Sequence, residues 1–360
     1  MEDPTPPIYR LPHDTLLQIL SHLPLRTLIS LRSVSKPFLH LLSSPSSFTH
    51  HLPLSLLALK PPNSNSNSLS LSSSSLLAFD PLQSHFLHFP LSFLLPLHPH
   101  PTPVAASHGL LYLWSHSTLI ACNPLTNSFK PLPPLGSAWS RHGHVLVSPP
   151  NRVLVLSELA ALYYSGDDSK GWVNFSSNLP AKPRSPILMN DTVLALCDVG
   201  SPWRSQWKLF SCTLSKWVWS RLDKHEWGDV FDILKRPRLV MGVGNRVLMV
   251  GGLRSSFSLN ASCSTILILR LDLETMEWAE AGRMPGEMFR RGFADSSKFK
   301  VFGGGSRVCF SAKRLGGRLA LWDFNEEDRK GEWRWIEGMP GCGDGVCRGF
   351  AFEARLTAVP

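Results

Sequence analysis

The chain has 360 residues, of which 43% are hydrophobic and 18% are charged, a composition typical of a globular protein with a sizeable core. Its net charge of +9 comes from basic residues that are mostly spread singly through the last third, without a Lys/Arg run or a basic helix. Nucleic-acid binding calls for a concentrated basic patch, so we expect no nucleic-acid partner.

The N-terminal residues do not resemble a secretory signal. The first ten contain two acids and three prolines, where a signal peptide would have a basic start and an apolar run. The longest apolar stretch, 86–97, is interrupted by a histidine and two prolines and is too short to span a bilayer. We therefore expect no membrane partner and a location in the cytoplasm, the nucleus or both. Seven scattered cysteines favour reduced thiols, including at Cys342 and Cys347.

Residues 11–43 have a helical period. Four apolar residues of the first segment recur at i, i+3, i+4 and i+7, which predicts one face of a helix that starts near Pro12 and stops at Pro24. A second short helix is predicted around 28–34. Ser35 is a candidate N-cap for a third, which contains Phe38. Three short helices cannot hide all these apolar side chains among themselves, so some should face the next domain or another protein.

The same segment resembles an F-box. The resemblance covers about forty residues and rests on two Leu-Pro pairs, at 11–12 and 23–24, followed by a Val-Ser-Lys-Pro-Phe run at 34–38. Two positions depart from the family pattern: Ser35 and Phe38 stand where F-boxes usually have Cys and Trp.

The F-box resemblance implies docking on the Skp-type adaptor of a cullin-based (SCF) ubiquitin ligase. The residues expected to supply the helical core and the adaptor-facing surface are Leu11, Pro12, Leu16, Ile19, Leu20, Leu23, Pro24, Leu28, Leu31, Val34 and Phe38. The alternative is that these helices only cap the domain that follows.

A Pro/Asn/Ser tract at 61–75 follows the helices. It cannot bury enough apolar surface to offset its ordering entropy, so we expect a flexible segment, either between domains or inside the first repeat. The predicted organisation is a disordered N-terminus at 1–10, an F-box at 11–50 and a β-domain at 51–360.

The β-domain repeats itself. A strand, an Asp/Asn-rich turn and an aromatic residue recur, and the aromatic anchors are Phe86, Phe129, Trp172, Trp217, Trp278 and Trp335. Successive anchors are 43, 43, 45, 61 and 57 residues apart. Spacings of about 40 to 50 residues are typical of propeller blades, whose stacked sheets bury faces that each repeat alone would expose. The pattern predicts a β-propeller of six blades, and the strand-like segment 348–354 is a candidate to complete the first.

Two later repeats resemble kelch motifs, because an apolar strand ends in a glycine pair at Gly251-Gly252 and at Gly303-Gly304. Glycine pairs suit a crowded strand end where backbones come close. A sandwich or another F-box-associated fold is the alternative architecture.

No constellation for chemistry stands out. The histidines at 85, 88, 98, 100 and 108 have no metal-ligand spacing, so we expect no metal and no cofactor. Trp139 and Trp203 are candidate exposed anchors for a partner.

The prediction is therefore a non-enzymatic subunit whose F-box binds a Skp-type adaptor, and through it a cullin, while the kelch-like propeller binds an unidentified target protein. The alternatives are a stand-alone propeller scaffold and a copper-dependent propeller oxidase.

Overall fold

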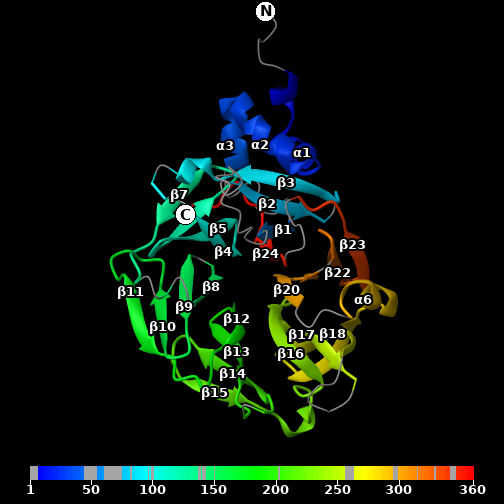
Figure 1. The fold of residues 1–360 in the computed structure, drawn as a ribbon. Coiled ribbons are helices and arrows are strands. Elements are labelled where there is room, and N and C mark those ends of the chain that lie inside the picture. The colour runs from blue at the N-terminus through cyan, green and yellow to red at the C-terminus, as the bar shows by residue number, and fades with distance from the viewer. Residues whose placement is uncertain are drawn as a thin grey trace, which may run out of the picture.

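The structure, a computed structural model, describes residues 7–43, 55–60, 75–81, 83–95, 97–98, 101–136, 139, 143–149, 151–201, 203–255, 263–294, 299–313, 315–327, 330–340 and 346–360. Short helices at the N-terminal end are followed by strands arranged around a centre (Figure 1). This arrangement confirms the predicted helical unit and β-propeller.

The N-terminal unit contains η1 (Pro7–Arg10), α1 (His13–Ser21), α2 (Leu25–Val34) and α3 (Lys36–Ser43). Pro12 and Pro24 occupy the N-cap positions of α1 and α2, where the missing proline N–H costs no helical hydrogen bond. Ser35 caps α3 as predicted, because its Oγ accepts a hydrogen bond from the Phe38 N–H at 3.4 Å. Residues 7–10 form a 3-10 turn, so the prediction of disorder is wrong for them.

Within the described residues, the strands form six four-stranded antiparallel sheets. With the innermost strand first, sheets 1 to 3 are β24 (Arg348–Glu353), β1 (Ser55–Lys60), β2 (Ser75–Asp80), β3 (His85–Pro90); β4 (Thr102–Ser107), β5 (Leu110–Ser115), β6 (Thr118–Asn123), β7 (Ser128–Pro131); and β8 (His144–Ser148), β9 (Arg152–Leu156), β10 (Ala160–Tyr164), β11 (Trp172–Ser176).

Sheets 4 to 6, in the same order, are β12 (Arg184–Met189), β13 (Thr192–Asp198), β14 (Trp207–Thr213), β15 (Trp219–Leu222); β16 (Leu234–Met241), β17 (Arg246–Arg254), β18 (Cys263–Asp272), β19 (Glu277–Arg283); and β20 (Phe299–Gly304), β21 (Arg307–Ala312), β22 (Leu319–Asn325), β23 (Lys330–Ile336). The inner strands β4, β8, β12, β16, β20 and β24 contact one another in turn around the centre (Figure 1). Short helices in the described residues between sheets or strands are η3 (Ser92–Leu94), η4 (His225–Trp227) and α6 (Gly286–Gly292).

The ring closes where the last strand pairs with the first. β24 pairs with β1 along its whole length, from Ser55 opposite Glu353 to Lys60 opposite Arg348. The segment 61–74 therefore falls between two strands of sheet 1 and not between domains. Residues 61–74 lie outside the described residues, so their predicted flexibility stays a prediction.

The aromatic anchors fall where the repeat predicts. Five of them lie in the outermost strands of their sheets, and Trp217 lies two residues before β15 with a φ of 53°. The Trp172 indole N–H donates to the Pro133 carbonyl at 2.8 Å, across to the preceding linker. The spacing of the anchors in the sequence is therefore the number of residues from one outer strand to the next.

The two glycine pairs lie at different positions in their sheets. Gly251 and Gly252 lie in β17, the second strand of sheet 5, whereas Gly303 and Gly304 end β20, the innermost strand of sheet 6. A side chain at Gly252 would come within 2.4 Å of the Cys263 sulfur, so close approach of the strands explains that glycine. Gly303 has a φ of +135°, which strongly favours glycine.

The cysteines differ from the prediction at one position. Cys122, Cys197, Cys212, Cys263 and Cys309 are free thiols. Cys347 is disulfide-bonded, so the expectation of an ordinary thiol is wrong there. Within the part of the chain that the structure describes, no helix combines the length and hydrophobicity needed to cross a membrane.

Asn123 holds the C-terminal tail to sheet 2. Its side chain is fully buried, and its Nδ2 donates to the carbonyl oxygens of Arg355 and Ala358, both at 2.9 Å. Its Oδ1 accepts from the Leu125 N–H at 3.0 Å. One residue of an Asn-Pro turn therefore connects segments more than 230 positions apart.

Substitution of Asn123 should destabilise the protein. Asn123→Ala removes three hydrogen bonds and should lower the free energy of unfolding by about 2–3 kcal/mol, at roughly 1 kcal/mol each. Asn123→Asp should cost more, because it buries a carboxyl group against two carbonyl oxygens. Urea unfolding of the two variants beside the wild type measures both effects. An Asp variant as stable as wild type would contradict the role given to the tail contacts.

Candidate functional site

The N-terminal helices and the propeller share one hydrophobic core. Leu16, Leu20, Leu28 and Leu42 from the helices belong to the same buried cluster as residues of sheets 1 and 2 and the C-terminal Phe352. Part of the predicted surplus of apolar side chains in the helices is therefore buried against the propeller. The helices are held against the outer side of sheet 1 (Figure 1).

A polar contact supports this attachment. One Arg32 guanidinium nitrogen of α2 donates to the Leu125 carbonyl at 3.5 Å, in the turn between β6 and β7, and another donates to the Ser43 hydroxyl at 3.4 Å. Burial lowers the pKa of Arg32. A cavity of about 240 Å³ remains between α2 and the propeller, lined by Leu25 and Ile29 on one side and by His88 and Leu125 on the other.

The eleven predicted adaptor-binding residues divide by exposure. The buried ones are Leu16, Leu20, Leu28 and Phe38; the half-buried ones are Leu23 and Leu31; the exposed ones are Leu11, Pro12, Ile19, Pro24 and Val34. Fully buried side chains cannot touch a partner in this conformation. The adaptor-binding assignment stays a prediction, and the five exposed residues, with the half-buried Leu23 and Leu31, are the ones that could make contact.

Several large aliphatic side chains of the helical unit are exposed. Ile19 is 44% exposed and Val34 66% exposed, although large aliphatic side chains are normally buried. Ile8 and Leu39 are also exposed, at 42% and 43%, and sequence reasoning missed both. Ile8 precedes the helical period, and Leu39 stands between the core residues Phe38 and Leu41 without a signal of its own. Such a concentration on a small unit indicates a protein partner.

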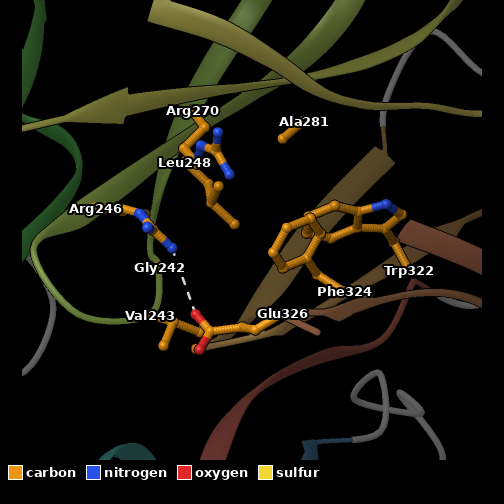
Figure 2. A pocket seen from close by; sticks show the side chains of 10 residues that line it. Gly242, Val243, Arg246, Leu248, Arg270, Ala281, Trp322, Phe324 and Glu326 are labelled. Atoms are coloured by element: carbon orange, nitrogen blue, oxygen red, sulfur yellow. Dashed lines mark hydrogen bonds and ion pairs between the residues drawn. The ribbon is translucent and has the colours of Figure 1, made fainter. Parts of the chain in front are cut away.

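A second groove lies between sheets 5 and 6, and its four lining residues are among the ten side chains that line the pocket in Figure 2. It has a volume of about 290 Å³ and is lined by Arg246, Arg270, Phe324 and Glu326. Arg246 pairs with Glu326 at 3.4 Å, and the Arg270 guanidinium lies 5.9 Å from the Phe324 ring centre. The lining residues include no nucleophile beside a base, and the charges of Arg246 and Glu326 are paired. The groove is best described as an ion-paired seam between two sheets.

The histidine-rich segment does not form a metal site among the described residues. His85 and His88 lie in β3, His98 follows η3 and His108 is in the turn after β4. His100 lies outside the described residues. Within the described ranges, no group of three His, Cys, Asp or Glu side chains could hold a metal ion.

Of the two tryptophans considered as exposed anchors, only one is exposed. Trp139 packs against the buried cluster between sheets 2 and 3. Trp203 is 83% exposed, in the loop between β13 and β14.

Comparison with known proteins agrees with the architecture. An F-box domain model matches residues 8–50 and a Kelch motif model matches residues 237–285, which span most of sheet 5. SKP1-interacting partner 15 of Arabidopsis thaliana is 56% identical over 379 residues, covering 98% of this chain and 99% of the relative. The chain belongs to the F-box/kelch-repeat family.

A more distant relative has the same organisation by name. An F-box/kelch-repeat protein of Arabidopsis thaliana is 28% identical over 299 residues, covering 78% of this chain and 70% of the relative. A chain from a crystal structure of the mitotic checkpoint complex superposes with a TM-score of 0.39 at 6% identity, covering 74% of this chain and 73% of that one. A superposition this loose carries no argument about function.

Proposed function

We propose that this F-box/kelch-repeat chain is the substrate-recognition subunit of an SCF-type E3 ubiquitin ligase. The helical unit docks on a Skp-type adaptor and through it on a cullin, and the propeller binds a target protein for ubiquitination. The observation that carries the proposal is the set of exposed aliphatic side chains on the helices, whose other apolar side chains pack on the propeller. The name of the near full-length relative supports it.

In this proposal the chain is not itself an enzyme. It holds the target, and transfer of ubiquitin is carried out elsewhere in the ligase. Because the helices share a hydrophobic core with sheets 1 and 2, the chain would act as a rigid arm between adaptor and target. In this proposal the chain works in the cytoplasm, the nucleus or both.

The test is an affinity pull-down of tagged wild-type chain beside a Leu11→Ala/Pro12→Ala variant. Leu11 is 38% exposed and Pro12 is also exposed, so truncating them should leave the fold intact and lower recovery of the adaptor severalfold. Mass spectrometry identifies the co-purifying chains.

Recovery of a Skp-type adaptor and a cullin with the wild type, reduced in the variant, supports the ligase function. Recovery of neither from cells that contain them overturns it and favours a stand-alone propeller scaffold.

A further inference from the structure

A further cavity lies where the C-terminal tail meets sheets 2 and 3, and we call it the tail cavity. Its volume is about 260 Å³, and its walls come from the β4–β5 turn, the β8–β9 turn and the tail after β24. Such a volume has room for on the order of ten non-hydrogen atoms, about one amino-acid residue. The described residues that line it include Leu110, Tyr112, Pro149, Asn151, Arg355 and Ala358.

The wall that the tail supplies is held in place. Asn123 binds the carbonyl oxygens of Arg355 and Ala358, so both residues lie against sheet 2. A side chain at Gly109, in the β4–β5 turn, would come within 2.5 Å of the Arg355 Cβ, which shows how closely the tail packs on this turn. The tail cavity is therefore a preformed feature of the fold, as ligand sites usually are.

Tyr112 brings a polar group without a partner to this cavity. Its side chain is only 2% exposed and belongs to the buried cluster between sheets 2 and 3. Within the described part of the chain, its hydroxyl forms no hydrogen bond. Burial raises the pKa of Tyr112 to about 12, so the hydroxyl keeps its proton at neutral pH and can donate it. A buried hydroxyl without a partner costs about 1–3 kcal/mol, which a bound acceptor would recover.

The neighbouring Tyr164 shows the ordinary arrangement of a buried tyrosine. It belongs to the same cluster, and its hydroxyl donates to an Asp168 carboxylate oxygen. Asp168 also forms an ion pair with Lys130 at 2.6 Å. Of these two tyrosines, the one that lines the tail cavity is thus the one whose hydroxyl lacks an acceptor among the described residues.

The charges around the tail cavity favour an anionic group. Arg355 binds Glu353 through Nε and Nη2, at 3.2 and 2.9 Å, and its Nη1 forms no hydrogen bond within the described ranges. None of the described lining residues is acidic, and between positions 15 and 157 the sequence has one acidic residue, Asp80. Burial and the neighbouring Arg355 lower the pKa of His108, a further lining residue, so His108 is neutral at pH 7.

We propose that the tail cavity binds the carboxylate of a molecule about the size of one amino-acid residue. The Tyr112 hydroxyl and Arg355 Nη1 donate to the carboxylate, because charge-assisted hydrogen bonds of this kind are strong. The apolar part of the ligand packs on Leu110, Pro149 and Ala358. The carboxylate belongs either to a free small acid or to the last residue of a protein chain, which present the same group. This site does not depend on the ligase function.

The experiment titrates the full chain with N-acetylglycine, N-acetyl-L-leucine and N-acetyl-L-phenylalanine and with the amide of each, followed by saturation-transfer NMR. Each amide has nearly the shape of its acid but no charge. At least one acid should bind at least about tenfold more tightly than its amide, because hydrogen bonds to a charged group are worth roughly twice those to a neutral one. Peptides of about five residues that end in the same residue distinguish the two sources: affinity equal to that of the acid indicates chain ends, and weaker affinity indicates free acids.

Two conservative variants separate binding from structure. Tyr112→Phe removes only the hydroxyl, so it should weaken binding of the acid by at least about tenfold and leave the unfolding midpoint at or above that of wild type. The matched control, Tyr164→Phe, loses the hydrogen bond to Asp168. It should unfold at a lower temperature and bind the acid within about twofold of wild type. Arg355→Gln should weaken binding of the acid and leave binding of the amide unchanged.

Equal binding of every acid and its amide overturns the proposal. Wild-type affinity in the Tyr112→Phe variant overturns it as well, and a lower unfolding midpoint in that variant would then show that Tyr112 is structural only.

Discussion

Removal of residues 348–360 should abolish the cooperative fold of the propeller. This deletion takes away β24, the innermost strand of sheet 1, and leaves β1 without its partner along six paired positions. It also removes Phe352 and Ala354, which are fully buried in the core that joins the helices to sheets 1 and 2. Losing one buried Phe side chain costs about 3–5 kcal/mol, and the whole strand should exceed the 5–15 kcal/mol that stabilises a typical domain.

The deletion is checked by thermal unfolding and limited proteolysis. Its control lacks only residues 359–360, where Val359 is 75% exposed, and should keep the wild-type midpoint. The single substitution Phe352→Ala is a milder change in the same strand. The variant should remain folded, with a free energy of unfolding lower by about 3–5 kcal/mol. A deletion variant with a sharp transition at the wild-type temperature would show that closure through β24 is dispensable.

The second large effect concerns the adaptor. Ile19→Asp/Val34→Asp should reduce binding of the Skp-type adaptor by at least about a hundredfold, because two apolar contacts are lost and two charges would have to be desolvated. Both residues are exposed, so the unfolding free energy should change by no more than about 0.5 kcal/mol each. Titration calorimetry with purified adaptor measures the affinity.

A matched control separates charge from position. Thr15→Asp/Thr27→Asp introduces the same two charges at exposed positions of the same two helices. It should bind the adaptor within a fewfold of wild type. Loss of binding in the control with retention in the Ile19/Val34 variant would place the adaptor on another face of the helices.

Sequence reasoning predicted local elements well. Pro12, Pro24 and the Ser35 cap bound the three helices almost where expected, because these signals act through the chain's own neighbours. The aromatic spacing located the outer strands for a similar reason, since each hairpin repeats one local pattern. The glycine pair at 251–252 lies in the segment that matches a Kelch motif, but the sequence did not show which strand each pair occupies, because a pair that permits close approach looks the same in the first strand of a sheet as in the second.

Exposure and proximity were decided only by tertiary structure. The period of α1 placed Leu16 and Ile19 on one face, but packing on the propeller buries Leu16 and leaves Ile19 exposed.

The sequence by itself determined that short helices precede a repeated β-domain, since hydrophobic period, prolines and aromatic spacing are local properties of the chain. Only the tertiary structure decided that the last strand completes the first sheet and that Asn123 holds the C-terminal tail to sheet 2. Ring closure brings together residues far apart in the chain, and no local preference encodes such a contact.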